Sequence, residues 1–369
     1  MIEQYQYTTT PKYNFPRSIQ DLQLPQQFIE LSLRTLRNIE TGKLFQPCTP
    51  TQLEYPTAPA QEAASPPFNR SIQPAIKPIP IKPIKDETPI IAVDVSSMKL
   101  GETEIGILCV IRAAIVWKQK QQYHYLRLGP FPFHITEENI NEVYYLFRQY
   151  SFLERPTLDY TNALSLMYAP TRLGSLLERW VQMGIAVQTR NSLILWDGSL
   201  TAGTQDFPVA VMSQLLETAR NRFNTILAFT KNTRLRLFGH CLTDYVNRCK
   251  PPCLLEMNGH PISLSDALHL LGNIYVAKLG EGNCSFRLDI DRKLSVEKAV
   301  EAAARLAGND VLLQSYPETL RLAHIYSTFT ANEVIGIQRF LARTNRLRIV
   351  TKPNVRRLLF GPFGKGPEN

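Results

Sequence analysis

The chain has 369 residues and a formal net charge of +9 at pH 7, and this length can hold one large or two modest domains with a packed core. No run of about 18 apolar residues occurs and the N-terminus lacks a signal-peptide pattern, so we expect a cytoplasmic protein without a membrane partner. The positive charge favours a polyanionic partner, although charge bears on association and not on fold.

Two segments are expected to precede the main domain. Residues 1–46 form an N-terminal helical segment, in which an amphipathic pattern at about 25–40 predicts a helix that packs on the main domain or on a partner chain. Residues 47–88 are rich in proline, which disfavours both helices and central strands. We therefore expect residues 47–88 to be an extended, partly disordered linker.

The main domain is predicted over residues 89–345. It opens with three consecutive strands, at 89–94, 104–117 and 121–129, of which the last two are joined by a polar turn. Helices then alternate with strands. The further predicted helices lie near 136–150, 171–184, 209–222, 233–246, 295–307, 317–329 and 331–343, and the further strands near 192–196, 224–229, 273–279 and 285–290.

Three meandering strands followed by alternating helices and strands predict a ribonuclease H-like fold, an α/β protein whose mixed sheet is flanked by helices. In this topology the fourth strand, at 192–196, lies parallel beside the first, at 89–94. The apolar runs of these strands end in Asp94 and Asp197. We therefore expect the two carboxylates to meet at one edge of the sheet, although they are far apart in the sequence.

Asp94, Glu178 and Asp197 are candidate ligands of a divalent metal. Mg²⁺ and Mn²⁺ prefer oxygen ligands, and two ions about 3.5–4 Å apart can hold the attacking and leaving oxygens of a phosphoryl displacement. A turn or a helix N-cap is the alternative explanation for each aspartate alone, and an exposed helical position is the alternative for Glu178. The joint pattern favours a metal-dependent nuclease.

A second constellation lies in the segment SYPETLRLAH, residues 315–324. Pro317 suits a first helical turn, and helical spacing would place Tyr316, Leu320, Ala323 and His324 on one stripe, so that His324 faces inward. A hydrogen-bonded core histidine is one interpretation. The other is that His324, beside the Tyr316 hydroxyl, contacts a phosphate or orients a nucleophilic water.

Basic side chains are candidate contacts to nucleic-acid phosphates. Lys231 directly follows the apolar strand ILAFT, and Arg234 follows shortly after it. Residues 346–369 are predicted to form a basic C-terminal tail, for which a solvated surface is an equal alternative. The tail residues proposed to bind DNA are Arg346, Arg348, Arg356 and Arg357.

Four potential soft-metal ligands, Cys241, Cys249, Cys253 and His260, lie close together in the sequence. Their spacing matches no standard zinc-finger pairing, so we expect ordinary reduced cysteines there.

Several of these segments together resemble the NurA nuclease family: AVDVSS around Asp94, the helix that carries Glu178, LILWDGSL around Asp197, the lysine after ILAFT, and SYPETLRLAH. The resemblance spans about residues 89–345. It implies that Asp94, Glu178 and Asp197 bind Mn²⁺ or Mg²⁺, and that Tyr316 and His324 complete the active site.

The same resemblance implies a 5′-to-3′ exonuclease on DNA with endonuclease activity on single strands, acting in end resection for double-strand break repair. It further implies a homodimer and a HerA-type hexameric translocase as partner. The chain departs from the family pattern at Val95, where the first motif has glycine and where a valine would crowd the metal or the substrate, and in the linker at 47–88. Neither departure removes a proposed ligand.

Two other functions are compatible with the same residues. One is a non-catalytic nucleic-acid-binding scaffold that keeps the fold, which Val95 and the long linker favour. The other is a ribonuclease H-like enzyme acting on RNA or RNA–DNA hybrids, because no residue can be assigned to contact a 2′-hydroxyl.

Overall fold

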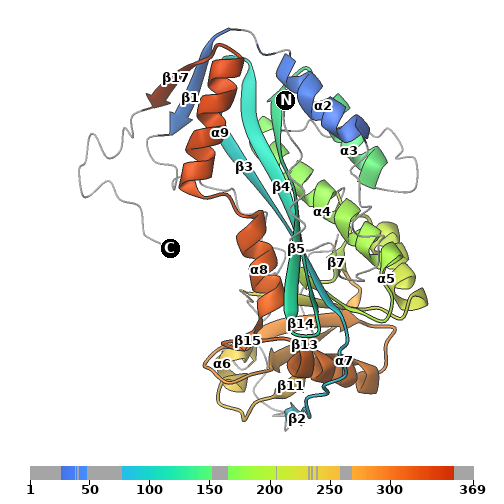
Figure 1. Cartoon of the computed structure of the whole chain (residues 1–369). Helices are drawn as coiled ribbons and strands as arrows, with labels where there is room; N and C mark the ends of the chain where they lie inside the picture. Colours follow the sequence, from blue (N-terminus) through green and yellow to red (C-terminus); the bar gives the residue numbers. More distant parts are fainter. Residues whose placement is uncertain are drawn as a thin grey trace.

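The computed structural model describes residues 26–37, 39, 41–47, 77–151, 165–204, 206–231, 233, 236–237, 240–257 and 268–352. These residues form a large mixed sheet with helices on both of its faces (Figure 1). The predicted fold class, an α/β protein built on a mixed sheet flanked by helices, is confirmed.

An antiparallel meander forms one side of the sheet. It consists of β3 (Ile90–Glu102), β4 (Gly106–Gln119) and β5 (Gln122–Thr136), each paired with the next along the chain. β4 is almost continuously buried because both of its faces are covered, which explains its unbroken apolar sequence. The three predicted strands are present. β3 and β5 are longer than the sequence indicated, whereas β4 has the predicted length and starts two residues later.

The fourth and fifth strands of the predicted order follow on the other side of β3. β6 (Leu193–Asp197) lies parallel to β3, with Trp196 opposite Val93, and β8 (Thr225–Thr230) lies parallel to β6. The expected adjacency of the first and fourth strands is therefore confirmed.

Four further strands extend the sheet beyond β8, and all of them pair antiparallel: β14 (Phe286–Asp291), β13 (Gly272–Lys278), β11 (Cys253–Glu256) and β2 (Ile79–Pro80). β2 belongs to the segment predicted as a linker. Its neighbour Ile81 is buried, so the end of that segment is part of the packed sheet edge.

At the opposite edge, two strands from the ends of the described chain pair with each other. β1 (Lys43–Pro47) runs parallel to β17 (Arg348–Lys352), and β1 joins β3 through one residue pair, Phe45 opposite Glu102. β1 lies at the border between the predicted N-terminal segment and the predicted linker, and β17 lies in the predicted basic tail. No strand was predicted in either place. Because both join the main sheet, we propose that they form one structural unit with it.

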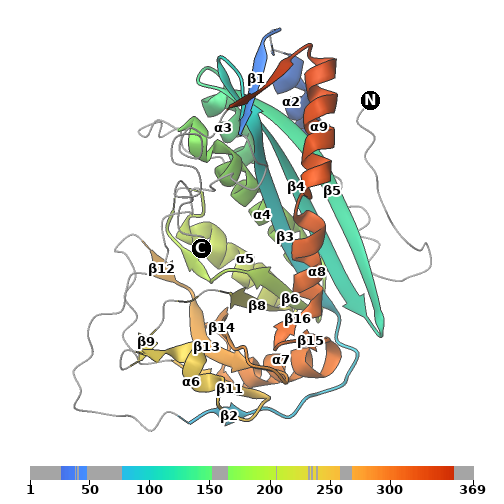
Figure 2. The ribbon, with the colours of Figure 1, turned by 90° about the vertical axis from the view of Figure 1, so that its left-hand side faces the viewer.

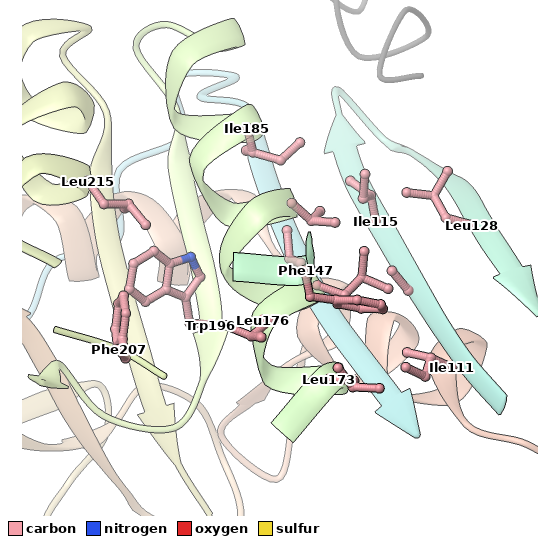
Figure 3. Close-up of a cluster of buried hydrophobic side chains, with 14 of the residues drawn as sticks. Ile111, Ile115, Leu128, Phe147, Leu173, Leu176, Ile185, Trp196, Phe207 and Leu215 are labelled. Atoms are coloured by element: carbon pink, nitrogen blue, oxygen red, sulfur yellow. The ribbon is translucent and has the colours of Figure 1, made fainter. Parts of the chain in front are cut away.

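One face of the sheet is covered by α2 (Gln26–Arg37), α3 (Ile140–Ser151), α4 (Ala169–Gln188) and α5 (Val209–Asn221). α4 lies at the centre of this layer, and apolar residues at helical spacing point from it into the core (Figure 3). Burying each such side chain contributes about 1.5–3 kcal/mol. The labelled members of this cluster include Leu173, Leu176 and Ile185 of α4, Trp196 of β6, and Ile111 and Ile115 of β4.

The other face is covered by α7 (Val296–Asn309), α8 (Glu318–Ser327) and α9 (Ala331–Thr344). α8 and α9 follow each other along the length of the meander (Figure 2). α9 starts at a capping box in which Thr330 and Glu333 satisfy each other's backbone N–H groups, which separates it from α8.

Of the predicted helix at 233–246, only residues 242–246 are helical among the described residues, and the prediction is wrong for 236–237 and 240–241. Two short paired strands, β9 (Arg236–Leu237) and β10 (His240–Cys241), precede a helix of one turn, α6 (Leu242–Val246). The alternating Arg-Leu sequence has the period of a strand, and Gly239 disfavours a helix.

The remaining elements are small. The helix η2 (Leu166–Tyr168) precedes α4, and two further pairs of strands are β7 (Thr201–Ala202) with β12 (His269–Leu270), and β15 (Leu312–Leu313) with β16 (Tyr316–Pro317). None of the described helices combines the length and the apolar character that a membrane crossing requires.

Candidate metal centre

Asp94 and Asp197 meet at one sheet edge, as the topology predicted. Asp94 directly follows the part of β3 that pairs with β6, and Asp197 is the last residue of β6. One potential ligand atom each of Asp94, Asp197 and His324 lies within 4.8 Å of the other two. Three elements distant in sequence therefore place two carboxylates and an imidazole around one point.

His324 reaches this point from α8. Its Nδ1 lies 3.3 Å from Asp94 Oδ2, and its side chain is 51% exposed. The prediction that His324 faces inward is wrong, because Leu320 and Ala323 take the core-facing positions of α8 and His324 lies at their flank. The hydrogen bond to Asp94 raises the pKa of His324, although desolvation opposes this, so protonation of the ring is favoured.

Tyr316 lies at the site but not on the helix. It belongs to β16, before α8 begins, so the predicted shared stripe with His324 is wrong. Its ring is buried against the edges of Phe229 and Phe286, and its hydroxyl has no hydrogen-bond partner among the described residues. Burial and the carboxylates of Asp197 and Asp94 raise the pKa of Tyr316, so the hydroxyl keeps its proton.

Lys231 follows β8, the strand beside β6, and its Nζ lies 2.5 Å from Asp197 Oδ2. Burial raises the pKa of Asp197, the Lys231 ammonium opposes that rise, and the nearby Asp94 adds to it. The side chain of Lys231 remains 36% exposed, so the ammonium faces both the carboxylate and the solvent.

Glu178 lies on α4 at the margin of this group. Its carboxylate accepts a hydrogen bond from Gln182 Nε2 at 3.0 Å. Burial raises the pKa of Glu178 to about 7; the Arg179 guanidinium opposes the rise, and Asp94 and Asp197 add to it. Glu178 is thus within electrostatic reach of both aspartates, but it is not one of the three residues whose ligand atoms converge.

Ser327 is a site residue that the sequence analysis missed. It is fully buried on the last turn of α8, its hydroxyl donates a hydrogen bond to Asp94 Oδ2, and Ser96 Oγ lies 3.2 Å from its Oγ. Helical spacing could have identified Ser327, because residues three positions apart in a helix are neighbours on its surface and Ser327 follows His324 by three positions.

The loop after Asp197 is held by backbone contacts. Gly198 has φ +124°, a conformation that L side chains rarely adopt, and its N–H donates to Phe229 O at 2.7 Å. Thr230 Oγ1 donates to Gly198 O at 2.8 Å, and the N–H of Leu200 donates to Asp289 Oδ2 at 3.0 Å. The Asp-Gly-Ser-Leu segment therefore has a fixed path.

Val95 does not lie over the Asp94 carboxylate. Successive residues of a strand point to opposite faces, and Asp94 points toward α8 whereas Val95 packs with the core under α4. Gly174 allows α4 to approach there, because a Cβ at this position would lie 3.2 Å from Ser97 and 3.9 Å from Val95. Val95 therefore lies on the side of β3 that faces α4, the helix that carries Glu178, and the crowding of the metal or the substrate by Val95 stays a prediction.

The structure does not bring the described tail arginines to the carboxylates. Arg346 follows α9 and Arg348 begins β17, and both are exposed at the far edge of the sheet. Arg234, Arg356 and Arg357 lie outside the described residues, as does His260. Among the described residues, Cys241, Cys249 and Cys253 form no disulfide.

No protein-family model matches the sequence, and no curated protein sequence matches it. Among solved structures, the NurA nuclease from Sulfolobus solfataricus aligns with a TM-score of 0.48 and 17% identity over 73% of this chain and 88% of that chain. Endonuclease V from Bacillus subtilis aligns with a TM-score of 0.33 and 11% identity over 72% of this chain and 88% of that chain. At these values the likenesses do not bear on activity.

Proposed function

We propose that the protein is a divalent-metal-dependent nuclease that hydrolyses DNA phosphodiester bonds by a two-metal mechanism. The observation that carries this proposal is the convergence of Asp94, Asp197 and His324 within 4.8 Å at the ends of two parallel strands. Two carboxylates this close repel each other, and a bound cation is one way to relieve the repulsion. The carboxylate oxygens of Asp94 and Asp197 suit Mn²⁺ or Mg²⁺.

Each residue has a defined task in this proposal. Asp94, Asp197 and Glu178 would hold the metal ions, and such ions would polarise the phosphate and activate a water. The exposed ammonium of Lys231 would contact a substrate phosphate when a cation holds the Asp197 carboxylate. His324, whose raised pKa favours the charged ring, would donate to a phosphate oxygen. Tyr316 would offer its hydroxyl, which has no hydrogen-bond partner among the described residues, to the same region.

The NurA-like motifs extend the proposal. Asp94, Asp197, Tyr316 and His324, which carry the resemblance, lie at one site with Glu178 at its margin. On this basis we propose 5′-to-3′ exonuclease and single-strand endonuclease activity in DNA end resection, in a homodimer that works with a HerA-type translocase in the cytoplasm. These finer assignments rest on the motifs alone. They are tested by the position of the label that is released first, and by the molar mass of the protein in solution.

The direct test of activity uses purified protein with end-labelled single-stranded DNA, double-stranded DNA and RNA, in Mn²⁺, Mg²⁺ or EDTA. We expect DNA cleavage in the presence of metal and none in EDTA. Asp94→Asn and Asp197→Asn should lose nearly all cleavage, while Glu281→Gln, which changes an exposed acid, should behave as the wild type. Preferential cleavage of RNA would instead support the ribonuclease alternative.

A non-catalytic scaffold is the second candidate, and one observation favours it. Lys231 and His324 already pair with Asp197 and Asp94, so the carboxylates have partners without any metal. On that account the wild-type protein binds nucleic acid but cleaves none of the three substrates with either metal, and neither metal changes its thermal stability.

A further inference from the structure

The strand that carries Asp94 has a stretch without a neighbouring strand on one side. β4 pairs along the whole of β3, so β6 and β1 both lie at the other edge. β6 pairs with residues 90–93 of β3, and β1 pairs only at Glu102. Among the described strands, none pairs with residues 94–101 of β3 at the edge that faces away from β4.

Exposure along β3 follows this pairing. Residues 90–94 are buried, residues 95–99 are partly exposed, and Leu100 and Gly101 are buried again. Solvent therefore reaches β3 where the pairing is interrupted, directly after Asp94. We call residues 95–99 the β3 window.

Some backbone N–H and C=O groups of the β3 window point away from β4. In a strand, alternate N–H and C=O groups point to either edge, so part of those in the window point away from β4. Beyond the window, Leu100 O accepts a hydrogen bond from the side chain of Gln338 on α9, which shows how the edge is closed there. Within the window, the Ser97 hydroxyl and the backbone N–H groups that point away from β4 lie on a partly exposed stretch, whereas Ser96 Oγ already contacts Ser327 Oγ at 3.2 Å. Hydroxyl and backbone N–H groups commonly contact phosphates.

α9 forms a basic flank beside this edge. Glu333 bonds to Arg112 of β4 and Arg127 of β5, so its side of α9 faces the meander. Arg339 directly follows Gln338, whose side chain donates to Leu100 O at the end of the window, and helical rotation places Arg339 on the flank opposite Glu333, away from β4 and β5. Arg339 is exposed and has no carboxylate partner among the described residues.

Lys99 adds a second cation at the end of the window. Its Nζ lies 2.6 Å from Glu102 Oε1, and its side chain is 26% exposed. The metal centre thus lies at one end of the window, with His324 of α8 beside it, and Lys99 and Arg339 lie toward the other end. α8 and α9 follow one another along this line (Figure 2).

We propose that the β3 window, with Lys99 and Arg339, binds the sugar–phosphate backbone of one DNA strand and leads it to the metal centre. This proposal rests on the proposed nuclease function. The window is roughly 17 Å long at about 3.4 Å per residue, enough for two or three nucleotides, and groups facing one edge recur every second residue. Because helices cover both faces of the sheet beside the window, we expect it to bind a single strand in preference to a duplex.

The test compares Lys99→Gln/Arg339→Gln with the wild type and with Lys293→Gln/Lys298→Gln, which removes the same charge from exposed positions near the start of α7. Binding of a fluorescent single-stranded oligodeoxythymidylate is measured in EDTA at several salt concentrations, with a blunt duplex as competitor. The window variant should lose at least tenfold in affinity. The slope of log affinity against log salt should fall by about 1.4, as expected for two lost phosphate contacts, and the control should match the wild type.

The outcomes separate this proposal from the function it rests on. Equal affinity and equal salt slope in all three proteins, at unchanged thermal stability, would overturn the binding track even if the wild type cleaves DNA. Stronger binding of duplex than of single strand would overturn it as well. Selective loss of single-strand binding in a protein that cleaves nothing with either metal would support the track and refute the nuclease.

Discussion

The carboxylate of Asp289 accepts a hydrogen bond from the backbone N–H of Leu200, at 3.0 Å, and so joins β14 to the loop that carries Asp197. Asp289 is fully buried and forms two 2.7 Å contacts with the equally buried guanidinium of Arg287. Buried ion pairs are often no more stabilising than apolar side chains of similar size. This pair therefore matters more for the position of the loop than for overall stability.

We predict that Asp289→Ala is strongly destabilising, by about 3–5 kcal/mol, because it leaves the Arg287 charge buried without this partner. Asp289→Asn keeps an oxygen that can accept from Leu200 and should fold, but with weaker metal binding because the loop is held less firmly. Urea unfolding and metal titration measure these two effects. A fully stable Asp289→Ala with wild-type metal affinity would show that the pair does not position the loop.

Ser327→Ala is predicted to weaken metal binding without unfolding the protein. The substitution removes the hydroxyl that donates to Asp94 Oδ2 and frees that carboxylate to move. A loss of roughly 10–100-fold in metal affinity is typical of such supporting residues. Thr328→Ala, which changes an exposed neighbouring hydroxyl, is the control and should keep wild-type affinity.

Glu178 predicts the pH dependence of the metal-free protein. Burial and the neighbouring aspartates hold its pKa at about 7 in the folded state, above its ordinary value near 4.5. The folded state therefore binds more protons than the unfolded state between these two values, so the Glu178 contribution to the free energy of unfolding falls as pH rises from about 4.5 to 7. In EDTA, Glu178→Gln should flatten this decline, as urea midpoints at pH 5 and pH 8 would show. If Glu178→Gln and the wild type showed the same dependence of stability on pH, the pKa of Glu178 would not be raised and its carboxyl would be exposed to solvent.

Glu333 predicts a loss of stability in acid. Partial burial opposes its ionisation, but hydrogen bonds from Arg112 and Thr330 outweigh this effect and lower its pKa to about 2. The stabilisation is complete above the unfolded pKa near 4.5 and is lost as pH falls through about 2. Glu333→Gln should lower stability at pH 7 and much less at pH 2. Equal destabilisation at both values would mean that the charge of Glu333 does not matter.

Local patterns predicted the centre of the sheet and two of its carboxylates correctly. The apolar runs before Asp94 and Asp197 identify two buried strands, and the order of elements fixes them as parallel neighbours. Burial explains why these runs form strands, because unbroken apolar strands are stable only in a sheet that is covered on both faces. The position of Lys231 beside Asp197 follows from the same order, since β8 lies next to β6.

Features that depend on contacts between distant segments were not predicted. The pairing of β1 with β17 joins the two ends of the described chain, and no local pattern specifies such a partner. His324 was predicted to face inward, but its side chain is 51% exposed. Helical spacing shows which residues share a face of a helix, but it does not show how far the buried part of that face extends. Asp289 appears in the sequence only as a charge within an apolar strand, and its role depends on a loop that is distant in the chain.

The central claim is that Asp94 and Asp197 form a metal site, and thermal unfolding in the presence and absence of Mn²⁺ tests it most directly. A ligand that binds only the folded state stabilises it, by about 2.7 kcal/mol at a concentration of 100 times Kd. We predict a rise in the Tm of the wild type at pH 8 with millimolar Mn²⁺, and no rise for Asp94→Asn. An unchanged Tm in the wild type, or an equal rise in Asp94→Asn, would contradict the account.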